Sequence, residues 1–225
     1  MECPASVDEL LQRAHGLAGL RLTEVGERHG LPVPQTLARH KGAVGQLIER
    51  ALGAPTTFGA GPDFPELGVE LKTLPIGKDQ RPSESTYVCK VSMDRIADEE
   101  WSSSAVREKL RCVLFVPIEG AHIPCVSDRR VGVPVLWRPS PDDESVLRAD
   151  WESLAGRIGA GEVEDITAHE GTALQLRPKA AHARERASAP GPDGGSIASL
   201  PRGFYLRASF TGALIARALG APALA

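Results

Sequence analysis

Three charged residues in the first third of the sequence have types and a spacing that suit metal-assisted hydrolysis. Asp63 follows Pro62, and seven residues later Glu70 and Lys72 form a Glu-x-Lys triplet. Alternate residues of a β-strand point to the same side, so Glu70 and Lys72 share one face of the strand expected there, and Asp63 lies at the turn before it. We therefore expect the three side chains to converge at one end of that strand.

This group has the donors of a magnesium site. Mg²⁺ prefers oxygen ligands, keeps several waters and is commonly held by one or two carboxylates together with substrate phosphate oxygens. Asp63 and Glu70 are the expected carboxylate ligands, and the backbone carbonyl of Leu71 could add another. Such a metal would lower the pKa of its water and neutralise charge on a scissile phosphate, while Lys72 would orient or help deprotonate the water.

Two further charged residues are candidates for the same chemistry. Glu49 shares a predicted helix face with Gly42 and Gly45. Two glycines on one helix face suggest that something approaches the backbone closely beside this carboxylate. Glu49 could reach a second metal or a bound water, and Lys109 could contact the phosphate.

A simpler interpretation of the triplet stays open. Glu70 and Lys72 could be an exposed ion pair on a solvated strand edge, contributing about 0 to 1 kcal/mol. Because Glu-x-Lys triplets are common, the residues alone indicate only a candidate nuclease. The sequence lacks a complete dinucleotide fingerprint, a phosphate-binding Gly-x-x-x-x-Gly-Lys-Ser/Thr loop and a Gly-x-Ser-x-Gly elbow. NTP hydrolysis and acyl transfer are therefore set aside.

Soft metal ligands are not paired along the chain. The six histidines show no His-Glu-x-x-His, and the cysteines are too far apart for a Cys-x-x-Cys pair, at Cys3, Cys89, Cys112 and Cys125. We expect reduced structural thiols and a metal held by oxygen.

The elements that must position these residues follow from hydrophobic periodicity and capping signals. Ser6 with Glu9 indicates a helix start, and Ser140-Pro141 begins a second helix that runs through Ile158. An apolar helical stripe over 44–52 is stopped by Gly53. The expected strands are 67–74, 86–91, 112–118, 133–137, 174–177 and 204–206, and a last helix is expected over 211–219.

Strands separated by helices, with hairpin-like pairs among them, predict a mixed α/β fold. The length of 225 residues favours one fold with two lobes. The stretch from Ala183 to Ser199 contains Ala-Pro-Gly-Pro-Asp-Gly-Gly-Ser and is predicted to be a flexible loop.

Composition narrows the class of protein. Hydrophobic residues make up 42% and charged residues 24%, as is ordinary for a globular protein. The longest apolar run, near Val113 to Ile118, is far shorter than the roughly 20 residues of a membrane helix. The N-terminus shows no secretory signal, so we expect a cytoplasmic protein.

The net charge of −3 hides an asymmetry. From Gly171 onward seven lysines and arginines stand against two acidic residues, so the C-terminal quarter is basic. A basic patch there could attract phosphates, and it could equally be an ordinary solvated surface.

At these residues the sequence resembles the MutH DNA mismatch repair endonucleases of the restriction-endonuclease-like superfamily. Sau3AI-type restriction enzymes would share chiefly the core. The resemblance implies a mixed sheet flanked by helices in a single 1–225 domain. Its catalytic lobe over about 1–110 and its DNA-reading lobe over about 111–225 would form a cleft for DNA. The matching segments span nearly the whole chain in one order: Lys41-Gly42, Leu67 to Thr73, Val113-Leu114, Arg129 to Gly132, Arg177 to Ala181 and Leu200 to Leu206.

The resemblance also implies roles for single residues. Asp63 and Glu70 match metal ligands, Lys72 matches the catalytic lysine, and Glu49 and Lys109 match an accessory active-site pair. A second set falls where the family contacts DNA: Lys41, Arg177, Pro178, Lys179, Tyr205 and Tyr87, the last at a methylation-sensing position where phenylalanine is familiar.

Without the resemblance, Arg177 and Lys179 would be ordinary strand charges and Tyr205 a core aromatic. Arg177 and Lys179 share one strand face, and Pro178 between them withholds a backbone donor, which predicts an edge strand.

The activity implied by the resemblance is Mg²⁺-dependent nicking of the unmethylated strand at hemimethylated GATC sites in double-stranded DNA. The protein would act as a monomer after activation by MutL, downstream of MutS. Two alternatives stay open: a GATC-type restriction endonuclease that cuts both strands, and a catalytically silent DNA-binding or MutL-docking module. Intact Asp63, Glu70 and Lys72 argue against the silent module.

Overall fold

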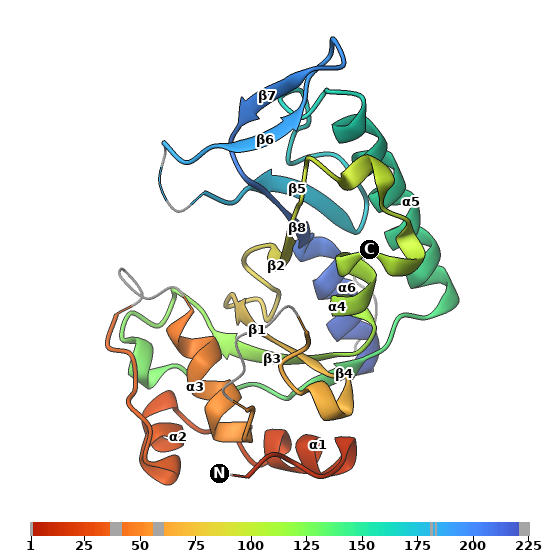
Figure 1. The fold of residues 1–225 in the computed structure, drawn as a ribbon. Coiled ribbons are helices and arrows are strands. Elements are labelled where there is room, and N and C mark those ends of the chain that lie inside the picture. The colour runs from red at the N-terminus through yellow and green to blue at the C-terminus, as the bar shows by residue number, and fades with distance from the viewer. Residues whose placement is uncertain (1, 37–41, 56–60, 181, 183, 221–225) are drawn as a thin grey trace. The chain divides into compact units, whose positions relative to one another are not determined.

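The computed structural model describes residues 2–36, 42–55, 61–180, 182 and 184–220 (Figure 1). Contacts divide the chain into two units that alternate along the sequence: unit 1 is Met1–Glu84, Arg111–Arg138 and Gly212–Ala225, and unit 2 is Ser85–Leu110 and Pro139–Thr211. The division is therefore not a single cut near residue 110.

The sheet of unit 1 is mixed and explains this alternation. β1 (Glu70–Ile76) pairs in parallel with β3 (Val113–Glu119), which pairs antiparallel with β4 (Val135–Trp137). Parallel neighbours need a long crossover connection. The chain between β1 and β3 provides it and includes the first segment of unit 2. β3 is buried along nearly its whole length, as its continuous apolar run predicts.

Three helices complete the N-terminal part of unit 1: α1 (Val7–His15), α2 (Leu22–His29) and α3 (Ala43–Leu52). α1 begins where predicted, since the Ser6 hydroxyl accepts a hydrogen bond from the Glu9 amide at 3.1 Å. α3 buries the predicted apolar stripe and ends at Gly53, whose φ of +85° is the left-handed cap that glycine adopts readily. α2 was not predicted, because its N-cap residue is an arginine rather than a preferred capping residue.

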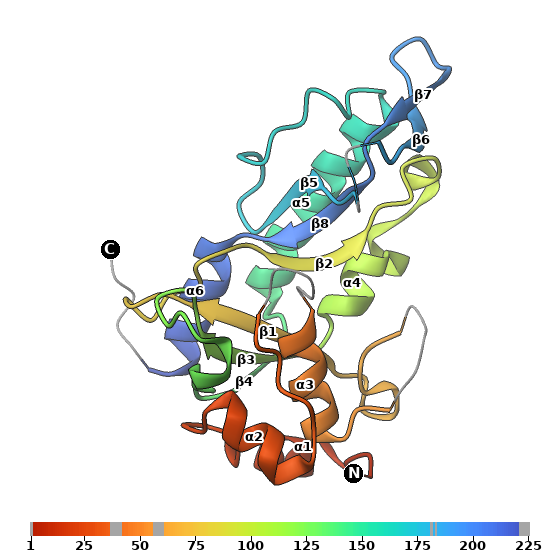
Figure 2. The ribbon, with the colours of Figure 1, turned by 90° about the vertical axis from the view of Figure 1, so that its left-hand side faces the viewer.

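Unit 2 contains an antiparallel sheet with β8 in the middle. β8 (Arg202–Leu206) pairs on one side with β2 (Thr86–Lys90) and on the other with β5 (Leu174–Pro178) (Figure 2). α5 (Pro141–Gly159) packs against β5, and α4 (Ala105–Leu110) packs against β2. Both helices lie on the same side of this sheet (Figure 1).

α5 begins at the predicted N-cap, Ser140, which forms a capping box that was not predicted. The Asp143 amide donates to the Ser140 hydroxyl at 3.1 Å, and the Ser140 amide donates to the Asp143 carboxylate at 3.2 Å. Pro141 occupies the first turn, where its missing N–H costs nothing.

The prediction of a flexible loop over 183–199 is wrong for most of that stretch. β6 (Ala187–Pro190) and β7 (Ser196–Ser199) form an antiparallel hairpin, and the Gly191 amide donates to the Gly195 carbonyl at 2.8 Å across its turn. The Gly and Pro residues that suggested a loop lie in this turn, apart from Pro190 at the end of β6. The flanking strands consist of serine, alanine, Pro190 and a single β-branched residue, Ile197, so they carry little of the β-branched and aromatic signal that is typical of strands.

The last helix, α6 (Ala208–Ala218), begins three residues before its predicted start. Its first four residues belong to unit 2 and the rest to unit 1. None of the helices in the described ranges is both long and apolar enough to span a membrane.

Candidate active site and nucleic-acid interface

Glu70 is the first residue of β1, and it is buried. The strand was expected from Leu67, but a 3-10 turn, η1 (Pro65–Leu67), and Gly68 with φ of +63° delay its start. The Glu70 amide donates to the Cys112 carbonyl at 2.9 Å where β1 meets β3. Glu70 is 3% exposed, and a carboxylate so far from water needs a counter-charge or hydrogen bonds.

Lys72 supplies that counter-charge. Its Nζ donates to Glu70 Oε1 at 2.5 Å, and the two side chains are 16% and 4% exposed. The alternative of a solvated surface pair is therefore wrong. Breaking a buried pair leaves an uncompensated charge at a cost of about 3 to 5 kcal/mol, well above the value of a surface pair.

Asp63 lies beside the same strand. An isolated bridge between Phe64 and Val69 closes the intervening turn and brings Asp63 back to β1. Its Oδ2 accepts a hydrogen bond from the Leu71 amide at 2.8 Å. Asp63 is therefore hydrogen-bonded to Leu71, the residue between Glu70 and Lys72, at the start of β1.

Glu49 lies on α3, which packs against β1. A Cβ added at Gly45 would lie 3.6 Å from Glu49 Oε1 and 3.7 Å from Thr73 Oγ1, so the Glu49 carboxylate sits over Gly45 near the face of β1 that carries Thr73. Sequence reasoning missed Thr73, whose only signal was its place in the strand. Gly42 is instead the N-cap of α3, and a Cβ there would meet no atom of the described residues within 4 Å, so these residues do not show the close approach inferred at this glycine.

The oxygen donors in this group fit a hard cation. No three His, Cys, Asp or Glu side chains within the described ranges form a metal-binding group. Asp63 and Glu70 supply two carboxylates. The Leu71 carbonyl leaves the strand on the same side as its amide, which faces Asp63 rather than β3. Two carboxylates and one carbonyl suit Mg²⁺, which completes its shell with water and phosphate oxygens.

Two predicted site residues are not part of the group around Glu70. Lys109 is a half-buried residue of α4 and belongs to unit 2, whereas Asp63, Glu70, Lys72 and Glu49 belong to unit 1. Lys41 falls outside the described residues.

Apart from Lys41, the residues predicted to contact DNA lie on the sheet of unit 2 or, for Lys179, directly after its strand β5. Directly opposed residues of antiparallel strands point to the same face. The register opposes Tyr205 to both Tyr87 and Gln175, and Arg177 to Gly203. The neighbouring positions, Leu174, Leu176, Phe204 and Leu206, are buried on the face covered by α4 and α5.

Two tyrosines and two cations form a cluster on the face away from these helices. The rings of Tyr87 and Tyr205 meet edge to face with centroids 5.3 Å apart. The Lys179 Nζ lies 4.4 Å from the Tyr87 centroid, and the Arg177 guanidinium carbon lies 5.8 Å from the Tyr205 centroid. Pro178 lies between the two cations and is exposed. Its strand, β5, is an outer strand of this sheet, as predicted.

Two residues that support this tyrosine-cation cluster were not identified from the sequence. A Cβ at Gly203 would lie 3.0 Å from Tyr87 Cε2 and 3.2 Å from the Cys89 carbonyl, so glycine permits the close packing. Its signal was an isolated glycine inside a strand. The Ser85 hydroxyl accepts a hydrogen bond from Arg177 Nη1 at 2.6 Å, and nothing in the sequence marked Ser85.

The Tyr87 hydroxyl stays protonated at neutral pH. Burial, with smaller contributions from Cys89 and Tyr205, raises the pKa of Tyr87 to about 12. The cluster therefore presents the neutral Tyr87 phenol beside two positive charges, a combination suited to base edges and phosphates.

Comparison with known proteins gives matches along most of the chain. A family model described as the DNA mismatch repair enzyme MutH matches residues 52–150. The DNA mismatch repair protein MutH of Pectobacterium atrosepticum is 48% identical over 95% of this chain and 93% of its own length. The protein of the same name from Shewanella baltica is 47% identical over 96% and 97%, and that of Vibrio parahaemolyticus is 46% identical over 92% of each. These matches include residues of both units.

Proposed function

Because this chain belongs to the MutH family of DNA mismatch repair enzymes, it is a mismatch repair endonuclease, and we propose that it nicks the unmethylated strand of hemimethylated GATC sites. The observation that supports this chemistry most strongly is the buried Glu70–Lys72 pair with Asp63 bound to the intervening amide. A protein that only bound DNA would have no use for this costly arrangement.

In this proposal Asp63, Glu70 and the Leu71 carbonyl would hold Mg²⁺, which would supply a water of lowered pKa and neutralise charge on the phosphate. Lys72 holds the attacking water and balances the Glu70 charge. Glu49 binds a second ion or a water, and Lys109 contacts the scissile phosphate.

Recognition is assigned to the tyrosine-cation cluster of unit 2. Arg177 and Lys179 donate to bases and phosphates, and Tyr205, packed on Tyr87, reads the methylation state. Adenine N6 lies in the major groove, where one methyl changes both the donor pattern and the available space. Pro178 limits the local strand pairing, and Lys41 adds a DNA contact.

We further infer that the protein acts as a monomer in the cytoplasm and is activated by MutL after mismatch detection by MutS. Modest DNA binding by a protein of net charge −3 makes such a recruiting partner useful.

The deciding experiment uses supercoiled plasmids with one GATC site in unmethylated, hemimethylated and fully methylated forms, with and without Mg²⁺ and MutL. We expect nicked circles on hemimethylated plasmid, only with Mg²⁺ and faster with MutL. Linear product without a response to MutL would identify a restriction endonuclease. Specific binding without cleavage would identify a silent module.

A further inference from the structure

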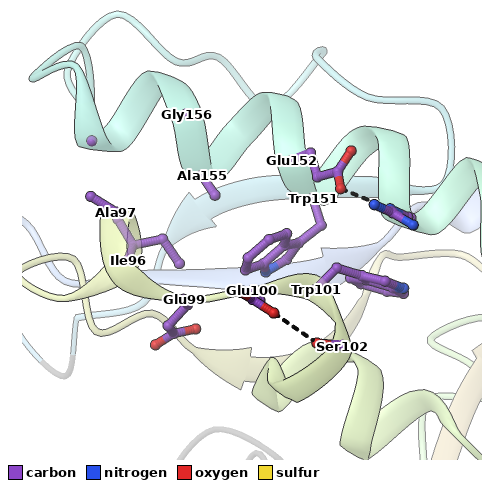
Figure 3. A pocket seen from close by; sticks show the side chains of 12 residues that line it. Ile96, Ala97, Glu99, Glu100, Trp101, Ser102, Trp151, Glu152, Ala155 and Gly156 are labelled. Atoms are coloured by element: carbon purple, nitrogen blue, oxygen red, sulfur yellow. Dashed lines mark hydrogen bonds and ion pairs between the residues drawn. The ribbon is translucent and has the colours of Figure 1, made fainter.

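A groove in unit 2 lies apart from every residue assigned above. It runs between α5 and the segment that contains η2 (Ile96–Asp98) and η3 (Trp101–Ser103) (Figure 3). Its volume of about 690 Å³ is within the usual range of ligand pockets. The floor is apolar and nearly inaccessible to water, with Ile96, Trp101, Trp151 and Ala155 each no more than 6% exposed.

The floor contains a polar group that lacks a partner. Trp151 is 3% exposed, and its Nε1 has no hydrogen-bond acceptor among the described residues. Trp101, whose ring centroid lies 5.9 Å away, donates its own Nε1 to Glu144 at 2.9 Å. A buried donor left unpaired costs about 1 to 3 kcal/mol. In Figure 3 the Trp151 indole extends from α5 toward the segment that contains η2 and η3. Its Nε1 is itself buried, so the ring contributes apolar surface to the groove and offers no donor to a ligand.

The rim of the groove is acidic. Glu99, Glu100 and Glu152 stand against Arg148, which already pairs with Glu152 at 2.7 Å. The Glu100 carboxylate accepts from the Ser102 hydroxyl at 3.2 Å, and the exposed Glu99 carboxylate has no partner within the described ranges. Excess negative charge repels DNA and attracts a cationic ligand.

α5 forms one wall of the groove and carries two glycines there, which play different parts. Gly159 packs closely on η2, since a Cβ there would lie 3.2 Å from the Ala97 Cβ. Gly156 lines the groove, and a Cβ there would meet no atom of the described residues within 4 Å. The helix backbone is therefore accessible at Gly156, and a larger side chain there would start in open space and extend into the groove.

We propose that this groove binds a linear peptide segment of a partner protein in which apolar side chains lie next to lysine or arginine. The apolar side chains pack on Trp101 and Trp151, and the basic side chain faces Glu99. A peptide fits better than a small metabolite, because the groove is open along α5 and combines an apolar floor with an acidic rim.

The test measures binding of the full chain to fluorescein-labelled hexapeptides by fluorescence anisotropy. The panel places two adjacent residues chosen from Leu, Ile, Met and Phe between Lys or Arg, with matched peptides in which the basic residues become Glu or the apolar ones become Ser. We expect the basic-apolar peptides to bind best. Gly156→Leu should weaken their binding at least about tenfold, because the leucine side chain fills the groove. The variant should still fold, since leucine favours a helix more than glycine does.

Two milder variants separate the contributions. Trp151→Phe keeps an aromatic ring but removes part of the apolar floor, and it should weaken binding of the apolar peptides about tenfold or less. Glu99→Gln should weaken the binding of basic peptides alone. Glu27→Gln, which removes the same charge from an exposed position of α2, should have no effect. Nicking without a partner should be unchanged in Gly156→Leu, which keeps this test independent of the proposed nuclease site.

Several results would overturn the proposal. One is that no basic-apolar peptide binds better than its acidic or polar counterpart. Another is binding that Gly156→Leu leaves intact, which would place the peptide elsewhere. A change in sedimentation of the unliganded Gly156→Leu protein would show that a second copy of this chain, rather than a partner segment, occupies the groove.

Discussion

Glu70 can lose its charge with almost no change of shape. The Glu70→Gln variant should lower nicking by roughly a hundredfold or more, since the metal loses a carboxylate ligand, while DNA binding changes little. Nicking of hemimethylated plasmid and equilibrium binding of a GATC duplex measure the two effects. Because Lys72 loses its counter-charge, a urea unfolding curve should accompany the assay.

The matched control for this variant is Glu66→Gln, an exposed carboxylate in η1. It should nick at the wild-type rate. Near-normal nicking by folded Glu70→Gln would remove Glu70 from the proposed metal site.

Tyr205 is the residue expected to discriminate methylated from unmethylated adenine. Tyr205→Ala should reduce the rate ratio between unmethylated and fully methylated sites by roughly 10-fold to 200-fold, the value of one methyl in a fitted contact. Tyr205→Phe keeps the ring contact with Tyr87 and separates the ring from its hydroxyl. If both variants keep the wild-type ratios, the sensing role is lost, although the catalytic assignment stands.

The Tyr205→Phe variant also isolates Tyr87, because the chain has only two tyrosines. Its phenolate absorbance should titrate well above pH 10, because the variant removes only the smaller Tyr205 contribution and keeps the burial that chiefly raises the pKa to about 12. The folded protein then holds this proton more tightly than the unfolded chain, whose tyrosine pKa is about 10. Stability should therefore fall as the pH rises from about 10 toward 12, and be unaffected by this group below pH 10 or so. A midpoint near 10 in the folded state would contradict burial of the hydroxyl.

At the scale of elements, α5 fixes the start of β5 through Asp150. Its carboxylate accepts hydrogen bonds from the amides of Thr172 at 2.9 Å, Ala173 at 2.6 Å and Leu174 at 2.8 Å. Asp150→Asn should cost about 2 to 4 kcal/mol, because charge-assisted bonds weaken and one acceptor becomes a donor. It should also weaken specific DNA binding, since β5 carries Arg177.

Urea unfolding and GATC duplex binding test Asp150→Asn. Ser153→Ala, at an exposed position of the same helix, is the control and should leave both unchanged. An unaltered unfolding midpoint for Asp150→Asn would mean that these hydrogen bonds do not fix β5.

At the scale of the whole molecule, charge is segregated along the chain. Seven lysines and arginines lie after Gly171 in a protein of net charge −3, and we expect their phosphate contacts to supply much of its DNA affinity. Affinity for a GATC duplex should fall roughly a hundredfold or more between about 50 and 200 mM salt. Lys179→Ala should reduce the slope of this dependence, and Lys78→Ala, an exposed lysine of unit 1, should not. Equal slopes for both variants would exclude Lys179 from phosphate contact.

The sequence by itself determined the features that depend on neighbours a few residues apart. The helix starts at Ser6 and Ser140 and the stop at Gly53 are local hydrogen-bonding and backbone preferences, so they were predicted correctly. The spacing of Asp63 from the Glu70 triplet likewise predicted their convergence, because a short turn and one strand suffice to bring them together.

Only the tertiary structure decided the features that join distant segments. Burial of Glu70 depends on the chain beyond it returning to pair with β1 in parallel, and the tyrosine-cation cluster depends on β2, β5 and β8 meeting in one register. The groove at Trp151 likewise needs η2 and η3 against α5. Such contacts offset the entropy of closing long loops only when many form together, so no local pattern of residues records them.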